Sequence, residues 1–277
     1  MQSVLDPLLA GFGTDRVAEG MRYATRGGKR LRGFLVIEGA SLFDIPPEQS
    51  RWAAAAIECI HAYSLVHDDL PCMDDDDLRR GQPTVHRKWD EATAVLVGDA
   101  LQTVAFEVLS DPVVHSSANV RLSLVRTLAR ASGAAGMVQG QAQDIAAETS
   151  PAPLSLEQIT ELQAKKTGAL IRWSAEAGAI LGEQPTEPLR KYATSLGLAF
   201  QIVDDILDIE GDEAKTGKRV GKDSDAGKAT FVSHLGLDGA KKKARDLVAD
   251  AIDALSLYSA QADYLRHAAE FVVSRDT

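Results

Sequence analysis

Two clusters of aspartate contain the residues of this sequence that most clearly could do chemistry. The first, HDDLPCMDDDDLRRG over residues 67–81, holds six aspartates and ends in two arginines and a glycine. The second lies far along the chain in FQIVDDILDIEGD, residues 200–212. Carboxylates are the oxygen ligands that Mg²⁺ prefers, and bound Mg²⁺ keeps several waters that phosphate oxygens can replace. The clusters therefore indicate a divalent-cation site that could act on a phosphorylated substrate.

The second cluster places its polar residues on one face of a predicted helix. The residues at i, i+3, i+4 and i+7 are Gln201, Asp204, Asp205 and Asp208. Positions with this spacing line up on an α-helix, and like charges four residues apart repel each other. A cation bound between the carboxylates would offset that repulsion. Because the intervening residues are apolar, we expect the helix to pack into a core rather than lie on the surface.

A similar face leads into the first cluster. His61, Ser64 and Asp68 occupy positions i, i+3 and i+7. Pro71 must bend the chain after them, and the bend could return Asp74 to the side of Asp68. Taken alone, the run DDDD is more simply a solvated acidic turn. Two separate clusters that each follow an apolar helix favour a shared metal site.

Basic residues of the types that bind phosphate accompany the acids. The stretch RGGKRLRG contains Lys29, Arg30 and Arg32 beside two glycines. Arginine binds phosphate through a rigid fork and lysine as a point charge. The stretch lacks the spacing of a P-loop, so alone it is more often a turn at a helix end. Lys166 lies on the apolar stripe of a predicted helix, where it would face a bound anion or extend its tip to solvent.

The elements that must position these residues are helices. SLEQ at residues 155–158 is a capping box, and apolar residues at helical spacing continue to residue 182, which predicts one long helix. The same pattern runs over 50–69 and 187–209. Strand-like alternation is scarce, so we predict an all-α chain. No connector is long enough to be an interdomain linker, which favours a single domain over residues 1–277.

The whole-chain composition excludes several classes of protein. With 277 residues, 45% hydrophobic and 25% charged, the sequence is typical of a globular chain. A net charge of -10 argues against a nucleic-acid binder, because phosphate backbones attract surplus Lys and Arg. Cys59 and Cys72 show no CxxC spacing, so neither a zinc site nor a disulfide framework is indicated. Without a signal segment or an unbroken apolar stretch of bilayer length, we expect a soluble, cytoplasmic protein with no membrane span.

Five segments resemble, in order, the motifs of the trans-isoprenyl diphosphate synthase (polyprenyl synthetase) family. They are GGKRLR (27–32), IHAYSLVHDDLPCMDDDDLRRGQPTVH (60–86), GDALQTVAF (98–106), KTGALI (166–171) and GLAFQIVDDILDIEGDEAKTGKRVGKD (197–223). The resemblance spans nearly the whole chain and is closest to bacterial farnesyl diphosphate synthases. It implies the isoprenoid synthase fold, a single-domain bundle of about ten or more helices around a central cavity. It also implies a homodimer.

The resemblance implies a role for each motif residue. The carboxylates that would bind Mg²⁺, about three ions per active site, are Asp68, Asp69, Asp74, Asp204, Asp205 and Asp208. The residues that would bind isopentenyl diphosphate are Gly28, Lys29, Arg32, His61 and Arg80. Those that would bind the diphosphate of an allylic substrate are Arg79, Lys166 and Lys218. The residues expected to take part in catalysis are Lys166, Thr167, Gln201 and Lys218.

The implied reaction joins isopentenyl diphosphate to dimethylallyl or geranyl diphosphate, forms farnesyl diphosphate and releases diphosphate. Metal ions and cationic side chains would neutralise the charge that develops on the leaving diphosphate. The released diphosphate would then accept the last proton. Synthases that stop at geranyl or continue to geranylgeranyl diphosphate are the nearest alternatives. A terpene cyclase would need no second diphosphate pocket, and a non-catalytic subunit would tend to lose aspartates that are complete here.

Tyr63 and Ser64 bear on the length of the product. They stand five and four positions before Asp68, which on a helix is about 6–7.5 Å deeper. An aromatic side chain there would close the floor of the tail cavity after a few isoprene units, as the farnesyl pattern of the family implies. Tyr63 could instead be an ordinary core residue whose hydroxyl bonds to a neighbouring backbone group.

Two further features bear on the site. Gly33 replaces the proline that usually follows KRLR in the family, a change expected to affect only local stiffness. The polar loop over 210–230 is expected to close when substrate and metal bind, because Lys218 in particular would gain an anionic partner.

Overall fold

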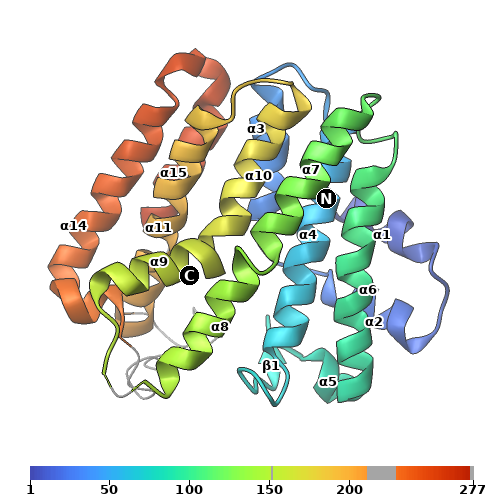
Figure 1. Ribbon diagram of the computed structural model, residues 1–277, viewed down its shortest axis with the longest axis horizontal. Coiled ribbons are helices and arrows are strands. Elements are labelled where there is room, and N and C mark those ends of the chain that lie inside the picture. The colour runs from blue at the N-terminus through green and yellow to red at the C-terminus, as the bar shows by residue number, and fades with distance from the viewer. Residues whose placement is uncertain (151, 211–228, 275–277) are drawn as a thin grey trace.

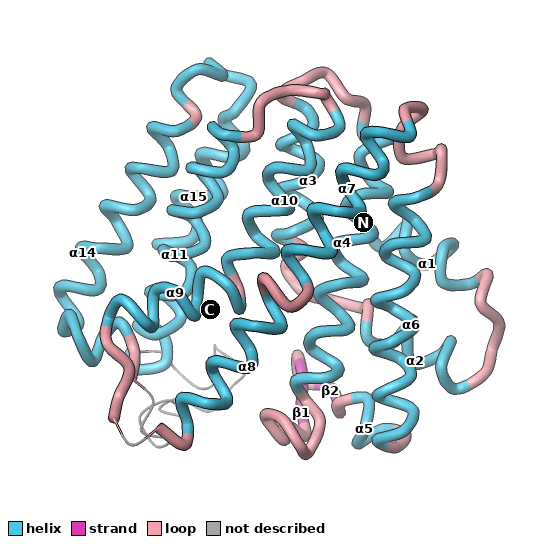
Figure 2. Tube along the Cα trace, in the orientation of Figure 1, coloured by secondary structure: helices cyan, strands magenta, loops and turns pink. Residues whose placement is uncertain are grey.

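A computed structural model describes residues 1–150, 152–210 and 229–274 of the chain. Within these ranges the strands are limited to the short β1 (Leu78–Arg79) and β2 (Gln82–Pro83), and Figure 2 shows that helices make up most of the rest. The helices are α1 (Gln2–Ala10), α2 (Arg16–Ala24), α3 (Leu31–Ser41), α4 (Pro47–Asp68), α5 (Val85–Lys88), α6 (Glu91–Ser110), α7 (Ala118–Ser132), α8 (Met137–Glu148), α9 (Leu156–Lys166), α10 (Gly168–Leu181), α11 (Glu187–Glu210), α14 (Phe231–Ala254), η1 (Ser256–Ala262) and α15 (Asp263–Ser274). The prediction of an all-α fold is confirmed.

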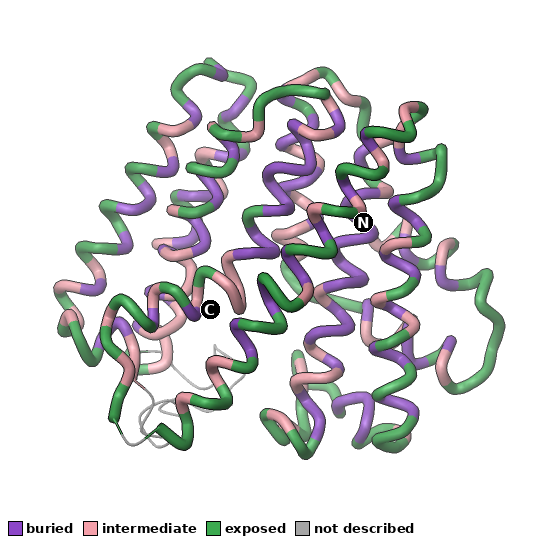
Figure 3. Tube along the Cα trace, viewed as in Figure 1, coloured by how far each residue is buried: buried purple, intermediate pink, exposed green. Residues whose placement is uncertain are grey.

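Two helices at the centre of the bundle, α4 and α10, are buried around most of their circumference. Residues 53–57 of α4 have no exposed surface, and Figure 3 shows both helices as largely buried. A helix that is apolar all round must be covered on several sides. Accordingly, α4 packs against α3 and α6, and α10 packs against α3, α7 and α11.

Helices α3 and α10 join the two halves of the bundle. The buried apolar residues form two clusters, one with α1, α4, α6 and α7 and the other with α11, α14 and α15, and both include residues of α3 and α10. Close packing of the two helices requires glycine, because a Cβ atom on Gly178 would lie 2.1 Å from the carbonyl carbon of Gly39. This sharing supports one domain over residues 1–277, which stays a prediction.

The helix predicted over residues 155–182 is in fact two helices. Ser155 and Gln158 form the predicted capping box at the start of α9, but the helix breaks at Thr167, whose backbone has φ -109° and ψ -45°. Figure 1 shows α9 and α10 running in different directions from this point. The apolar stripe continues through the break, so the periodicity gave no sign of it.

Helix α6 is long and apolar enough, by length and composition alone, to cross a bilayer, and it is the one helix of the described ranges that passes this test. Its apolar length therefore exceeds what was expected from the sequence. Half of its most apolar stretch is buried inside the bundle, and a core helix passes the same test, so the indication of a membrane span is weak. The other half leaves Val95 and Leu96 exposed.

The ends of the two helices that carry the aspartate clusters lie at the same end of the bundle. Figure 1 shows the C-terminal ends of α4 and α11 there, beside α8 and the junction of α9 and α10. Side chains that are far apart in the sequence therefore meet around one space.

Candidate active site

A cavity of about 2450 Å³ opens at this end of the bundle. It is lined by residues of α3, α4, α8, α9, α10, α11 and α15. Eighteen of the residues singled out from the sequence line it, namely Gly28, Lys29, Arg30, Arg32, Gly33, His61, Tyr63, Ser64, Asp68, Asp74, Arg79, Arg80, Lys166, Thr167, Gln201, Asp204, Asp205 and Asp208. Lys218 and most of the loop over 210–230 lie outside the described residues.

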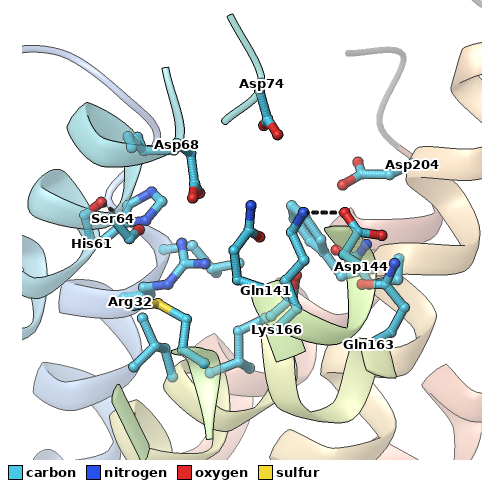
Figure 4. A pocket seen from close by; sticks show the side chains of 18 of the residues that line it. Arg32, His61, Ser64, Asp68, Asp74, Gln141, Asp144, Gln163, Lys166 and Asp204 are labelled. Carbon is cyan, nitrogen blue, oxygen red and sulfur yellow. Dashed lines mark hydrogen bonds and ion pairs between the residues drawn. The ribbon is translucent and has the colours of Figure 1, made fainter. Parts of the chain in front are cut away.

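The chain after α4 folds back as the sequence predicts. The backbone N–H of Asp74 donates to the carbonyl oxygen of Asp68 at 2.8 Å, and that of Asp75 donates to Leu70 at 3.1 Å. Figure 4 shows the carboxylates of Asp68 and Asp74 facing the cavity from one side. These two aspartates form the first acidic wall of the site.

Asp69 has a different position from its neighbour. Only 3% of its surface is exposed, and its carboxylate accepts hydrogen bonds from Arg79, one from Nε at 2.9 Å and another from Nη2. Arg79 lies on β1 and lines the cavity, whereas Asp69 is not among the lining residues. In this structure Asp69 thus positions Arg79, and its supporting role in metal binding stays a prediction.

Burial and charge raise the affinity of Asp68 for a proton. Burial raises the pKa of Asp68 to about 6, Lys166 counteracts this and Asp74 adds to it. A cation near Asp68 would relieve both the burial cost and the repulsion.

The predicted face of α11 forms the opposite wall. Asp204, Asp205 and Asp208 line the cavity, and Figure 4 shows Asp204 across the space from Asp68 and Asp74. Asp205 also accepts a hydrogen bond at 2.7 Å from the backbone N–H of Phe231, the first residue of α14. A carboxylate is favourable at a helix N-terminus. Asp205 therefore ties α11 to α14 with one oxygen.

The two acidic walls fit Mg²⁺ in their chemistry. Their ligands are carboxylate oxygens, which suit this hard cation. Within the described part of the chain, no group of three or more His, Cys, Asp or Glu residues is gathered closely enough to hold a metal ion by itself. Because Mg²⁺ keeps waters and accepts phosphate oxygens, a phosphorylated ligand between the walls could complete its coordination.

Helix α8 contributes residues that the sequence interpretation missed. The Nζ atom of Lys166 lies 2.6 Å from a carboxylate oxygen of Asp144, as the dashed line in Figure 4 shows. The two helices touch because of Gly140, where a Cβ atom would lie 2.2 Å from the backbone nitrogen of Lys166. Gln141 lies beside them, and its buried Nε2 has no hydrogen-bond partner among the described residues. The sequence signal that could have identified these residues was the spacing of Gly140 and Asp144, which stand one helical turn apart.

A cluster of cations occupies the part of the cavity near α3. Arg32 and His61 face it, and the buried Nε of Arg32 has no hydrogen-bond partner in the ranges described. Burial lowers the pKa of His61 well below its usual value, and the charge of Arg32 lowers it further. His61 is therefore neutral at neutral pH. The cluster has the composition of an anion-binding pocket.

Gly28 permits the position of Arg80 in this pocket. Gly28 has φ +80°, and a Cβ atom there would lie 2.7 Å from the guanidinium carbon of Arg80. Arg80 itself has φ +54°, and its Nη1 donates to the carbonyl oxygen of Arg26 at 2.9 Å. The turn over 26–28 and Arg80 thus form one unit.

Tyr63 lies deeper in the cavity and is 5% exposed. Its ring packs edge-on against His67, with ring centroids 5.8 Å apart, and His67 lies 3.0 Å from the carbonyl oxygen of Val95 on α6. Among the described residues, the Tyr63 hydroxyl has no hydrogen bond to a backbone group. Tyr63 both lines the cavity and belongs to the buried core, so its role in limiting product length stays a prediction. Ser64 donates to the carbonyl oxygen of His61 at 3.0 Å.

The raised pKa of Asp68 leads to a prediction about stability. The folded state binds the proton more tightly than the unfolded chain, so ionised Asp68 lowers stability above about pH 6, and this cost disappears below about pH 4. In EDTA at about pH 7, Asp68→Asn should raise the free energy of unfolding by about 1–3 kcal/mol. Urea denaturation at several pH values measures this.

Asp90→Asn serves as the control for Asp68→Asn. The hydrogen bond from the backbone N–H of Thr93 lowers the pKa of Asp90, so removal of its charge should not raise the free energy of unfolding under the same conditions. A loss of stability in Asp68→Asn at neutral pH would contradict the raised pKa.

Comparisons with known proteins agree with this geometry. The family model described as polyprenyl synthetase matches residues 14–267. The farnesyl diphosphate synthase of Escherichia coli (strain K12) is 48% identical over 274 residues, covering 96% of this chain and 91% of that protein. The farnesyl diphosphate synthase of Haemophilus influenzae is 46% identical over 263 residues, covering 93% and 88%.

Solved structures show the same fold. A FPP/GFPP synthase from Zymomonas mobilis has a TM-score of 0.88 and 49% identity, covering 98% of this chain and 95% of that one. The geranyltransferase from Helicobacter pylori, complexed with magnesium and isoprenyl diphosphate, has a TM-score of 0.80 and 35% identity, covering 93% and 87%. The chain is thus a prenyltransferase that belongs to the polyprenyl synthetase family.

Proposed function

We propose that the protein condenses isopentenyl diphosphate with dimethylallyl and geranyl diphosphates to give farnesyl diphosphate, releasing diphosphate at each step. The observation that carries this proposal is the presence of two differently charged regions in one cavity. Asp68 and Asp74 face Asp204 across one region, and the cation Arg32, with the neutral His61 beside it, lies in the other. Two diphosphates could bind side by side, one through metal ions and one through cations directly.

The acidic walls would hold Mg²⁺ through Asp68, Asp74 and Asp204, with about three ions per site. The magnesium in the Helicobacter pylori geranyltransferase supports the choice of metal. When bound, Mg²⁺ supplies neutralising charge to the leaving diphosphate. Asp208 lines the same wall, and Asp205 shares its carboxylate with Phe231.

The protein's own cations would bind the allylic diphosphate. Arg79 is fixed by Asp69, so its guanidinium is held ready without the entropy loss of ordering a long side chain. Lys166 is paired with Asp144 and would have to share its charge with the substrate. Lys218 is part of the proposal on sequence grounds alone.

The break at Thr167 would place its hydroxyl near the reacting carbon. Thr167 and Gln201 both line the cavity. Their oxygens could face the positive charge that develops on the allylic carbon, which is how preorganised dipoles lower a barrier. No carboxylate is needed as base, because the released diphosphate can accept the proton.

The pocket for isopentenyl diphosphate separates this proposal from a terpene cyclase. A cyclase acts on one diphosphate, so the second cluster of Lys29, Arg32, His61 and Arg80 would have no purpose. Binding of an isopentenyl diphosphate analogue to the purified protein distinguishes the two classes. The sequence retains every aspartate of both motifs, which likewise argues against a non-catalytic subunit.

The direct test is product analysis. Purified protein incubated with dimethylallyl diphosphate, isopentenyl diphosphate and Mg²⁺ should give farnesol as the main alcohol after dephosphorylation, and EDTA should abolish turnover. Geranylgeraniol as the main alcohol would contradict the farnesyl assignment. Mg²⁺ and diphosphate binding without turnover of any allylic substrate would favour the non-catalytic alternative.

Tyr63 should limit the length of the product. Tyr63→Ala opens the floor of the cavity and should shift the main product to longer alcohols, measured by chromatography of the dephosphorylated mixture. Tyr63→Phe is the matched control, because it keeps the ring and should keep the wild-type length. If Tyr63→Ala still stopped at the wild-type length, the floor would have to lie elsewhere.

We also propose that the protein is a homodimer that pairs through the outer face of α6. Val95 and Leu96 on this face are 42% and 53% exposed, and such apolar surface on a helix is typical of a protein interface. Leu96→Asp should convert the dimer to a monomer in sedimentation analysis with its helical circular dichroism unchanged. Leu257→Asp, on the exposed η1, is the control and should leave the dimer intact. A monomeric wild type would refute this proposal.

A cytoplasmic location is the remaining proposal. Cys59 and Cys72 are both free thiols, which suits a reducing compartment. Recovery of the protein in the soluble fraction of its cells would support it, and recovery with membranes would not.

A further inference from the structure

Glu58 of α4 is a buried carboxylate that the reaction itself does not use. It is 3% exposed and stands one helical turn before His61. A buried charge is costly unless it is paired and hydrogen-bonded. Glu58 accepts a hydrogen bond from the backbone N–H of Gly33 at 2.8 Å and another from Nη1 of Arg30 at 3.1 Å. Its two carboxylate oxygens thus accept hydrogen bonds from two residues near the start of α3.

Arg30 lines the cavity too, but its guanidinium is bound to the turn that precedes α3. Besides Glu58, its guanidinium donates to Oε1 of Gln2 at 2.7 Å and to the carbonyl oxygen of Thr25. Its backbone has φ +56°, a left-handed conformation that a residue other than glycine adopts at a cost. The bonds of its side chain therefore fix a strained residue between Lys29 and Arg32, which line the cavity with it.

Gly33 supplies a donor that proline lacks. Its N–H is the partner of Glu58, and proline has no N–H to donate. A Cβ atom at Gly33 would lie 3.3 Å from both Cγ and Oε1 of Glu58, so the carboxylate sits tightly against the backbone. The expectation that this glycine affects only local stiffness is therefore wrong.

The charge of Glu58 also offsets the cations around it. Burial lowers the pKa of Arg32, and Glu58 is the largest opposing influence. Burial and Arg30 lower the pKa of Arg80, and Glu58 again opposes them more than any other acid. Glu58 thus reduces the repulsion among cations that line one pocket.

We propose that Glu58 is a positioning residue of the isopentenyl diphosphate pocket. Through Gly33 and Arg30 it fixes the turn that presents Lys29 and the first turn of α3 that presents Arg32. The identity of the anion rests on the function proposed above. The carboxylate itself does not touch the anion, since its oxygens are bound to the start of α3.

Glu58→Gln tests this role because it keeps the shape of the side chain and an acceptor for Gly33 but removes the charge that pairs with Arg30. The KM for isopentenyl diphosphate should rise about tenfold, while the KM for geranyl diphosphate should change less than about twofold. Titration calorimetry with isopentenyl diphosphate alone should show the same loss of affinity without turnover.

Glu176→Gln is the matched control. Glu176, on α10, is another buried carboxylate; it lies away from the cavity and pairs with Arg190 of α11 at 2.6 Å. The Glu176→Gln variant should lose stability as Glu58→Gln does, but both of its KM values should stay unchanged. Equal effects of the two variants on KM would mean that Glu58 only stabilises the fold, and would overturn the proposal.

Arg30→Lys decides the question if Glu58→Gln does not fold. It keeps the charge but cannot make the three bonds of the guanidinium, so it too should raise the KM for isopentenyl diphosphate selectively. An unchanged KM in this variant would overturn the proposal. A wild type that shows no turnover of isopentenyl diphosphate would instead refute the proposed function, which separates the two failures.

Discussion

Electrostatic repulsion within each group of like charges is the force that this fold must oppose. Carboxylates gather on two walls of the cavity and cations gather near α3, and repulsion within each group grows as water is excluded. The structure places an opposite charge behind or beside these groups. Asp69 lies behind the cavity and holds Arg79, Glu58 holds Arg30, and Asp144 pairs with Lys166. These pairs fix the directions of the charged side chains that they contain. They do not neutralise a whole group of like charges, so a bound ligand must supply the remaining opposite charge.

The local parts of the fold could be predicted from the sequence because they depend on helical periodicity. The helix expected over 187–209 is α11 with nearly the same bounds, and its polar face points into the cavity as its spacing required. The fold-back of Asp74 onto Asp68 followed from Pro71. In contrast, the break at Thr167 coincides with the contact of Gly140 against the backbone of Lys166, and a contact between distant segments leaves no mark on periodicity.

The residues of the site divide in the same way, into those that local spacing predicts and those that depend on contacts between distant segments. Of the six aspartates predicted to bind Mg²⁺, five line the cavity and Asp69 does not. Asp69 is turned away because its partner Arg79 lies on the hairpin that follows, and neighbouring aspartates give no sign of which will be paired. Glu58 was missed because a single glutamate in an apolar helix is ordinary, and only the fold brings Gly33 and Arg30 to it.

The contact between α4 and α6 has a consequence for how this enzyme could evolve. His67 supports Tyr63 and itself lies against Gly98, where a Cβ atom would overlap the imidazole at 2.0 Å from Nε2. Any larger residue at position 98 would overlap the His67 ring, which lines the cavity, and would have to displace it. Helix α6 thus supports a wall of the cavity through His67 without lining the cavity itself. Selection could therefore alter the range of products through α6 while every catalytic residue stays the same.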